Sequence, residues 1–212
     1  MGTKRFDKYR NQYSSKSLVE SQLALDPIQQ FEKWFSQAAK KESKDPNAMV
    51  LSTVSATGRP SSRVVLLKDL CEDGFTFFTN YLSRKGKELH SNPYASLLFY
   101  WPTLMRQVKI EGRVKKRSAQ ANDTYFYSRP INSQAASIAS SQSRKLSSKK
   151  ELVSRFEKIL KEESQIKRPD HWGGYIVKPT RFEFWQGQPD RMHDCFLYKK
   201  RKKIWSIERL NP

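Results

Sequence analysis

Cationic and hydroxyl side chains occur together at several places in the sequence, in patterns that suit the binding of anions. Arg63 and Lys68 flank the apolar stretch "VVLL". We expect a buried strand here, and cations at both of its ends need anionic partners because an unpaired buried charge is costly. Arg84 and Lys85 follow Ser83, which we expect to cap a helix whose free N–H groups attract anions. Taken alone, such a pair is more often an ordinary exposed one.

A second pattern is the spacing of four between Tyr125, Arg129 and Ser133. If the chain is helical through Ser128, Tyr125 and Arg129 share a face, and Pro130 must end the helix close by. A phenol, a guanidinium and a hydroxyl together can surround a phosphate monoester. The commoner alternative is a tyrosine in the core beside a surface arginine.

The third pattern is the stretch "WQGQPDRMHD", which contains Arg191 and His193. In a strand these two side chains point to the same face. A histidine beside an arginine can orient a polar substrate and can move protons, although a surface hairpin with a satisfied histidine fits as well. His193 and Cys195 do not predict a metal site, because no C-x-x-C motif or second histidine cluster completes the ligand set.

The composition narrows the class of protein. The 212 residues are 37% hydrophobic, and 40 Lys and Arg against 21 Asp and Glu give a net charge of +19. Such a charge fits either a polyanion-binding protein or a lysine-rich solvated surface. The basic runs fall where turns and helix flanks are expected, at residues 40–41, 115–117, 149–150 and 199–203. This placement favours the solvated surface, so nucleic-acid binding is not expected.

The expected cellular location follows from three features that the sequence lacks: a membrane helix, a signal peptide and a disulfide framework. No run approaches the roughly 20 apolar residues of a membrane helix, and the charged N-terminus has no apolar segment typical of a signal peptide. The two cysteines, Cys71 and Cys195, cannot form a disulfide framework. We therefore expect no membrane association and a location in the reducing cytoplasm.

The periodicity predicts an α+β protein. Residues 1–25 are polar and are expected to form a flexible N-terminal arm, and residues 26–212 a single domain. Asp26 caps a helix with Pro27 at its first position. Short β-branched or aromatic stretches then predict antiparallel strands around a β-barrel, at residues 48–55, 61–70, 75–80, 95–101, 106–116 and 173–188, with a closing hairpin at 194–210. A short helix after Ser83 and a helical region at 118–165 interrupt the strands.

In this order, the motifs resemble those of the pyridoxamine 5'-phosphate oxidase family, the FMN enzymes of vitamin B6 metabolism. The similarity runs from Asp26 to the C-terminal "ERLNP" and is carried by "SSRVVLLK", "GFTFFTNYLSRKGKEL", "NPYASLLFYW", "RQVKIEG", "YFYSRP", "WGGY" and "EFWQGQPDRMHD". The resemblance implies an FMN-binding split β-barrel with flanking helices. It also implies a homodimer with active sites at the subunit interface.

The resemblance further assigns roles to individual residues. It implies that the flavin contacts Arg63, Val64, Val65, Leu66, Phe78, Thr79, Arg84, Lys85, Gln107, Gln142, Ser143 and Trp185. It assigns the substrate phosphate to Lys68, Tyr125, Arg129 and Ser133. Arg191 and His193 are the implied catalytic pair over the pyridine ring, and Arg10 to Tyr13 the implied lid.

The implied reaction is the oxidation of pyridoxamine 5'-phosphate or pyridoxine 5'-phosphate to pyridoxal 5'-phosphate, with O₂ consumed and H₂O₂ released. Cys195 departs from the family pattern, which usually has an arginine of the flavin site after "HD". A thiol supplies neither the charge nor the forked donors of a guanidinium, so we expect weaker FMN binding. The alternative is a flavin-binding relative with weak or no oxidase activity.

Overall fold

The computed structural model describes residues 12–42, 44–71, 73–162, 166–202 and 204–212. The contacts of the chain divide it into two compact units. Unit 1 comprises the described parts of Met1–Asn47, Leu98–Ile110 and Thr180–Pro212, and unit 2 those of Ala48–Leu97 and Glu111–Pro179. The predicted division into an arm of residues 1–25 and a single domain stays a prediction.

The described residues contain one antiparallel sheet whose longest strands contribute to both units. The hydrogen-bonded order is β2-β1-β5-β6-β7-β4-β3, with β8 paired to β7 and β9 to β8. The strands are β1 (Ala48–Val54), β2 (Pro60–Leu66), β3 (Asp69–Cys71), β4 (Gly74–Asn80), β5 (Tyr94–Trp101), β6 (Arg106–Lys116), β7 (Trp172–Gln186), β8 (Asp194–Arg201) and β9 (Ile204–Leu210). One half of β7 pairs with β4 and the other half with β8. The predicted antiparallel α+β fold is therefore confirmed.

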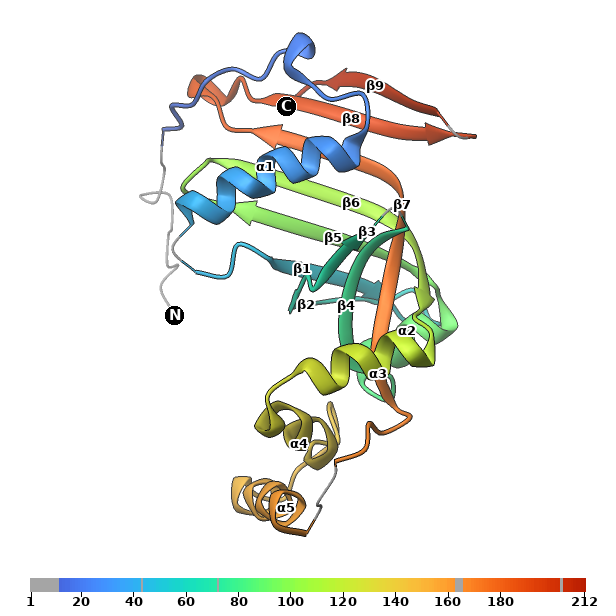
Figure 1. Ribbon diagram of the computed structural model, residues 1–212. Coiled ribbons are helices and arrows are strands. Elements are labelled where there is room, and N and C mark those ends of the chain that lie inside the picture. The colour runs from blue at the N-terminus through green and yellow to red at the C-terminus, as the bar shows by residue number, and fades with distance from the viewer. Residues whose placement is uncertain (1–11, 43, 72, 163–165, 203) are drawn as a thin grey trace, which may run out of the picture. The chain divides into compact units, whose positions relative to one another are not determined.

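In unit 1, helix α1 (Pro27–Lys41) covers one face of the sheet (Figure 1). The helix begins as predicted: the Asp26 side chain accepts a hydrogen bond from the Ile28 N–H, and Pro27 occupies the first turn. Phe31, Trp34 and Ala38 on its inner face are buried, with Phe31 4.9 Å from Phe99 between ring centroids. Burial of this aromatic face is what holds the helix on the strands.

Unit 2 contains the remaining helices: α2 (Arg84–Ser91), α3 (Ala119–Ser128), α4 (Ile131–Ala139) and α5 (Lys149–Glu162). Ser83 caps α2, because its Oγ accepts from the Gly86 N–H at 3.3 Å. Gly86 is required there, since a Cβ atom would lie 2.1 Å from the Tyr81 carbonyl oxygen. A small core of Phe126, Ala135, Ile166 and Trp172 joins α3 and α4 to strand β7, and side chains of α5 pack against it.

One expectation about a strand was wrong. The stretch after Arg63 is not a buried strand: β2 lies at the edge of the sheet order, and every second residue from Pro60 to Val64 is exposed. Burial of a strand depends on its neighbours, and in the sheet order of the described residues β2 pairs with β1 alone. Arg191 and His193 lie between β7 and β8, outside the expected strands as well as the observed ones. Pro189–Arg191 form the 3₁₀ turn η2, in which Asp190 and Arg191 have positive φ angles, and β8 begins only at Asp194.

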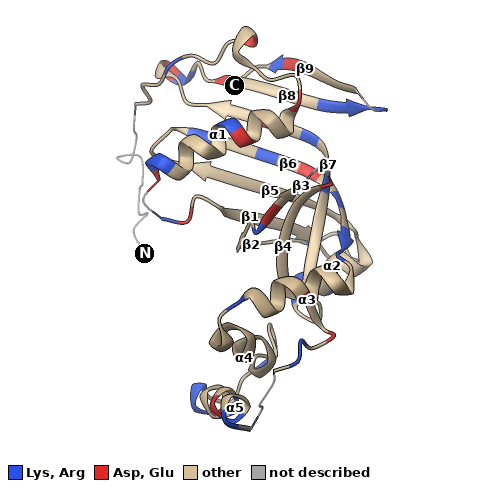
Figure 2. Ribbon diagram, in the orientation of Figure 1, with Lys and Arg blue, Asp and Glu red and all other residues tan. Residues whose placement is uncertain are grey.

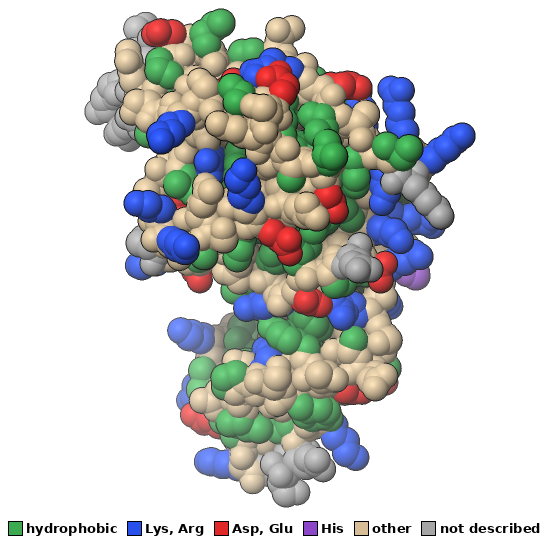
Figure 3. Space-filling view, turned by 45° about the horizontal axis from the view of Figure 1, so that its top comes forward, with side chains coloured by type: hydrophobic (Ala, Val, Ile, Leu, Met, Phe, Trp, Pro, Cys, Tyr) green, Lys and Arg blue, Asp and Glu red, His purple; other side chains and the backbone are tan. Residues whose placement is uncertain are grey.

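The basic residues are spread over the surface of the protein. The runs lie at the end of α1, the end of β6, the start of α5 and the β8–β9 hairpin (Figure 2). On the face in Figure 3, Lys and Arg side chains are interspersed with Asp and Glu. Among the described residues, none of the helices is long and apolar enough to cross a membrane.

Candidate functional site

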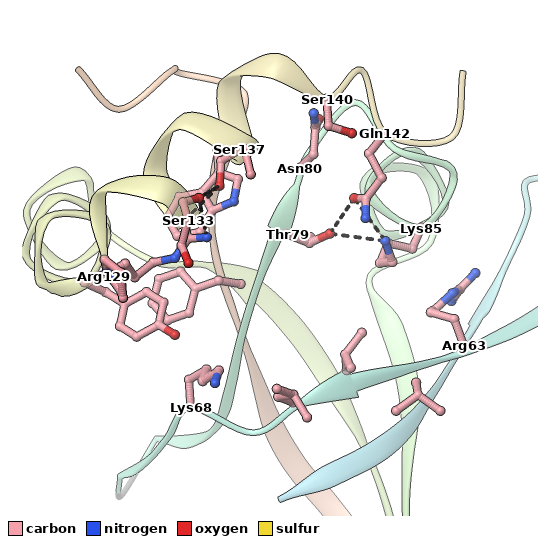
Figure 4. A pocket seen from close by; sticks show the side chains of 18 residues that line it. Arg63, Lys68, Thr79, Asn80, Lys85, Arg129, Ser133, Ser137, Ser140 and Gln142 are labelled. Atoms are coloured by element: carbon pink, nitrogen blue, oxygen red, sulfur yellow. Dashed lines mark hydrogen bonds between the residues drawn. The ribbon is translucent and has the colours of Figure 1, made fainter. Parts of the chain in front are cut away.

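A cavity of about 820 Å³ lies wholly within unit 2. Strands β2 and β4 and the helices α2, α3 and α4 contribute its walls (Figure 4). Its lining comprises Arg63, Val64, Val65, Leu66, Lys68, Phe78, Thr79, Asn80, Lys85, Tyr125, Arg129, Pro130, Ser133, Ala136, Ser137, Ser140, Gln142 and Trp172. Figure 4 shows the cationic side chains on two opposite sides, with Lys85 and Arg63 on one side and Arg129 and Lys68 on the other.

The first polar side is built around the ammonium group of Lys85. This residue is only 7% exposed, and its Nζ donates to Thr79 Oγ1 and to Gln142 Oε1, each at 3.2 Å. Arg63 lies on the same side of the cavity. Burial lowers the pKa of Lys85, and the charge of Arg63 lowers it further. The charge of Glu88 acts in the opposite direction. Among the described residues, no carboxylate accepts a hydrogen bond from this ammonium, so its charge has only neutral hydrogen-bond partners.

The second polar side is built around the guanidinium of Arg129. Its Nη1 donates to Ser137 Oγ at 2.8 Å and its Nη2 to the Ser133 carbonyl at 2.7 Å. The guanidinium also lies 4.6 Å from the centre of the Trp172 ring. Lys68 lies below Arg129 in Figure 4 and is exposed. These groups form a second cationic, hydroxyl-bearing wall.

Stacked aromatic rings close the second side of the cavity. Phe78 and Tyr125 are stacked with their centroids 3.8 Å apart, and Trp172 is stacked on Phe78 at 5.4 Å. Burial raises the pKa of Tyr125, so its hydroxyl stays protonated and able to donate a hydrogen bond. A flat apolar wall next to cations suits a ligand that has both a ring and an anionic group.

A separate cluster in unit 1 contains His193. The centroid of its ring lies 4.7 Å from the ring centroid of Trp185 and 5.5 Å from that of Tyr13. The backbone N–H of Gln188 donates to His193 Nδ1 at 3.0 Å. Because Nδ1 accepts this bond, the neutral ring carries its proton on Nε2. The imidazole can therefore donate a hydrogen bond through Nε2.

The N-terminal segment is attached to the same turn. The Gln188 side chain donates to Ser15 Oγ at 3.3 Å and to the Lys16 carbonyl at 3.1 Å. Ser15 Oγ in turn donates to the Gly187 carbonyl at 2.5 Å. The turn between β7 and β8 and the segment that carries Tyr13 therefore form one hydrogen-bonded structure.

Cys195 is buried in strand β8, opposite Trp185 on β7 and Leu210 on β9. Burial raises the pKa of its thiol, and the charge of Glu183 acts in the same direction. The thiol is therefore neutral at physiological pH and adds no positive charge to this part of the chain.

Comparison with known proteins decides the family. The family model for pyridoxamine 5'-phosphate oxidase matches residues 35–162, and the model for a pyridoxine 5'-phosphate oxidase C-terminal dimerisation region matches residues 172–212. The chain belongs to the pyridoxamine 5'-phosphate oxidase family.

Curated members of the family are similar over nearly their whole length. The pyridoxine/pyridoxamine 5'-phosphate oxidase of Paraburkholderia phytofirmans is 49% identical over 206 residues, which cover 96% of this chain and 97% of that protein. The protein of the same name from Actinobacillus pleuropneumoniae serotype 5b is 48% identical over 204 residues, with the same coverage.

Solved structures share the fold. PhzG from Burkholderia lata 383, crystallised with tetrahydrophenazine-1-carboxylic acid, superposes with a TM-score of 0.88 at 30% identity, covering 94% of this chain and all of PhzG. An FMN-binding protein from Nostoc punctiforme, described as related to pyridoxamine 5'-phosphate oxidase, superposes with a TM-score of 0.74 at 19% identity, covering 90% of this chain. The second match concerns the fold alone.

The pocket brings together most of the residues that the resemblance to the oxidase family had selected. Those lining it are Arg63, Val64, Val65, Leu66, Lys68, Phe78, Thr79, Lys85, Tyr125, Arg129, Ser133 and Gln142. Arg84 and Ser143 belong to unit 2 but are not among the lining residues, and Gln107, Trp185, Arg191, His193 and Cys195 belong to unit 1. Arg10 lies outside the described residues, whereas Tyr13 is described.

Some lining residues were missed by sequence reasoning. Ser137 on α4 and Ser140 at its C-cap follow Ser133 at spacings of four and three, so the spacing contained a signal for them. Trp172 gave no such signal, because it comes from a strand far along the chain and meets Arg129 only in the folded unit.

Proposed function

We propose that the protein is an FMN-dependent oxidase that converts pyridoxamine 5'-phosphate and pyridoxine 5'-phosphate to pyridoxal 5'-phosphate, with O₂ as the electron acceptor. The observation that carries the proposal is the pocket with two cationic sides. The nearly buried Lys85 has neutral partners on one side, and Arg129 lies on the other. Two phosphate monoesters, one from a cofactor and one from a substrate, would satisfy both sides.

The residues present fit FMN. A cavity of about 820 Å³ is within the range of roughly 300–1,000 Å³ typical of ligand pockets. Lys85, Arg63 and Thr79 would hold the phosphate, and the edge strand β2 would offer backbone groups beside Val64 and Val65. When bound, FMN supplies the acceptor for the hydride that leaves the exocyclic carbon of the substrate.

The second side of the pocket binds the vitamer. Arg129, Lys68 and Ser133 neutralise and orient its phosphate, and Tyr125 donates to it from the aromatic wall. These contacts align the exocyclic carbon and so lower the entropic part of the barrier. Arg191 and His193 orient the pyridine ring, with His193 donating through Nε2, and Arg10 with Tyr13 closes the site.

A homodimer with active sites at the subunit interface is part of the proposal. The match of residues 172–212 to a dimerisation region supports it. Mixing a Lys85→Met subunit with a His193→Ala subunit tests the interface. Shared sites predict that the mixture regains part of the activity that each variant lacks, whereas sites within one subunit predict no recovery.

A cytoplasmic location is also proposed, since a reducing compartment suits the unpaired thiols of Cys71 and Cys195.

The overall reaction balances without further reagents. Pyridoxine 5'-phosphate and O₂ give pyridoxal 5'-phosphate and H₂O₂, while pyridoxamine 5'-phosphate also takes up water and releases ammonia. A visible spectrum of the purified protein followed by a peroxide assay with pyridoxamine 5'-phosphate tests the proposal. A flavin spectrum with equal amounts of peroxide and pyridoxal 5'-phosphate supports it; a colourless protein that gains no colour or activity with added FMN refutes it.

The second candidate is a flavin-binding relative with weak or no oxidase activity. The observation in its favour is the buried, neutral thiol of Cys195 at a position where the resemblance implies an arginine. Protein that binds FMN tightly yet forms no pyridoxal 5'-phosphate from either substrate would establish this candidate instead.

A further inference from the structure

Glu88 is a buried carboxylate that joins three elements of unit 2. It lies on α2 one turn after Arg84, and its side chain is 6% exposed. Oε2 accepts from Thr53 Oγ1 at 2.5 Å, from Ser61 Oγ at 2.6 Å and from Arg63 Nη2 at 3.3 Å. Oε1 accepts from Arg84 Nε at 2.9 Å. The carboxylate therefore connects β1, β2 and α2.

Two of these elements carry the first cationic side of the pocket. Arg63 comes from β2 and Lys85 from α2, and Arg63 is held by the same group of side chains as Glu88: Nη1 donates to Thr53 Oγ1 and Nη2 to Ser61 Oγ, both at 2.6 Å. The guanidinium therefore has a fixed place even though β2 is an edge strand. A cation held in one place loses less entropy when it binds an anion.

The negative charge of Glu88 also reduces the repulsion between the cations around it. Arg63, Arg84 and Lys85 are three cations close to one another. The repulsion between their charges destabilises the folded protein. Burial alone would raise the pKa of the Glu88 carboxyl, but the hydrogen bonds from Ser61, Thr53, Arg84 and Arg63 outweigh this effect and lower the pKa to about 2. Glu88 is thus ionised and offsets part of the repulsion.

We propose that Glu88 is a positioning residue. It determines the phosphate affinity of the first side of the pocket, because it holds Arg63 and helix α2 in fixed positions relative to each other. It does not line the cavity and acts through Arg63. The inference rests on the proposed function, in that the phosphate belongs to FMN. It adds that Glu88 determines how strongly FMN is preferred over riboflavin, the same flavin without a phosphate.

The test compares FMN with riboflavin on the full-length apoprotein. Glu88→Gln keeps the size of the side chain, removes its charge, and turns N–H donors toward groups that are themselves donors. The matched control is Asp123→Asn, which removes one carboxylate from the Arg168–Asp123 ion pair of the same unit; Asp123 is not among the residues that line the cavity. Both variants change the net charge equally, so a general electrostatic effect on anions would be the same in both.

We expect Glu88→Gln to weaken FMN binding about tenfold and riboflavin binding less than about twofold, since one charge-assisted anchor is lost. Asp123→Asn should change either affinity less than about twofold. Unchanged FMN affinity, tighter FMN binding, or equal weakening of both flavins by Glu88→Gln would overturn the proposal.

Ser61→Ala provides a second, milder variant if Glu88→Gln does not fold. It removes the hydroxyl that contacts both Arg63 and Glu88. We expect about threefold weaker FMN binding, from the loss of about one modest hydrogen bond, with riboflavin unaffected. No FMN-specific loss in this variant would also overturn the proposal. Wild-type protein that does not prefer FMN over riboflavin would refute the proposed function itself, whereas wild-type preference with unaltered variants refutes only the role of Glu88.

Discussion

Replacing Lys85 by methionine should change ligand affinity and fold stability in opposite directions. The ammonium is 7% exposed, and its neutral partners leave its charge available to a bound phosphate. Loss of a charge-assisted hydrogen bond costs about 1.5–3 kcal/mol. We therefore expect FMN affinity to fall about tenfold to hundredfold.

The stability of the apoprotein should rise. Lys85→Met removes hydrogen bonds to Thr79 and Gln142, at 3.2 Å each, and a longer one to Ser83, at 3.5 Å, which together contribute about 2 kcal/mol. Thr79 keeps its own bond to Gln142 Oε1, so no buried donor is left unpaired. The desolvation cost of a buried ion is several kcal/mol. The balance favours the variant by about 1–2 kcal/mol, a rise in Tm of about 2–8 °C.

The difference in stability between Lys85→Met and the wild type should depend on pH, in a direction that the burial of Lys85 determines. Burial lowers the pKa of Lys85 below its usual 10.5 in the folded protein, so between the two pKa values the unfolded chain binds more protons at this residue. The contribution of Lys85 to the free energy of unfolding of the wild type therefore rises with pH in this window. The advantage of Lys85→Met should be largest at neutral pH and should shrink as the pH approaches 10.5.

The assays are FMN titration of the apoprotein and thermal unfolding at several pH values. Lys87→Met is the matched control, since Lys87 is exposed on the same helix and its replacement changes the net charge equally. The control should leave both quantities nearly unchanged. Unchanged FMN affinity in Lys85→Met, or a stability advantage of this variant that grows as the pH approaches 10.5, would refute the argument from burial.

Three further changes test other parts of the site. Cys195→Arg should tighten FMN binding about tenfold to hundredfold by adding a charged, forked donor; equal affinities in a titration would contradict this. Arg191→Ala and His193→Ala should each lower kcat/KM about tenfold or more, and steady-state kinetics with unaltered turnover and KM would remove both residues from the site. Trp172→Leu removes the ring 4.6 Å from Arg129, a contact of about 0.5–2 kcal/mol. It should raise KM for the phosphorylated substrates by about threefold to twentyfold at unchanged FMN affinity, and an unaltered KM would show that Arg129 needs no such support.

Elements that depend on short-range signals were predictable from the sequence. The Asp26 cap with Pro27, and the Ser83 cap of α2, are formed as expected. Strand β6, Arg106–Lys116, has the predicted bounds. Such features depend on residues a few positions apart, so the local sequence contains the information.

Exposure and turn geometry were not predictable in the same way. The stretch of β2 after Arg63 is as apolar as a buried strand, yet its place at the sheet edge leaves Val64 66% exposed. Near Arg191, positive φ angles break the extended pattern, and the turn is held by Gln188 and its contacts with the N-terminal segment. Both outcomes depend on parts of the chain far away in sequence.

The order of residue types by itself determined the family and the succession of elements. Only the tertiary structure decided how the cations are used. Arg63 and Arg84 share the carboxylate of Glu88, whereas Lys85, the neighbour of Arg84 in sequence, is left with neutral partners in the pocket wall. The physical reason is that the energy of a charge depends on its burial and on its distance from other charges, which are fixed only when distant segments pack together.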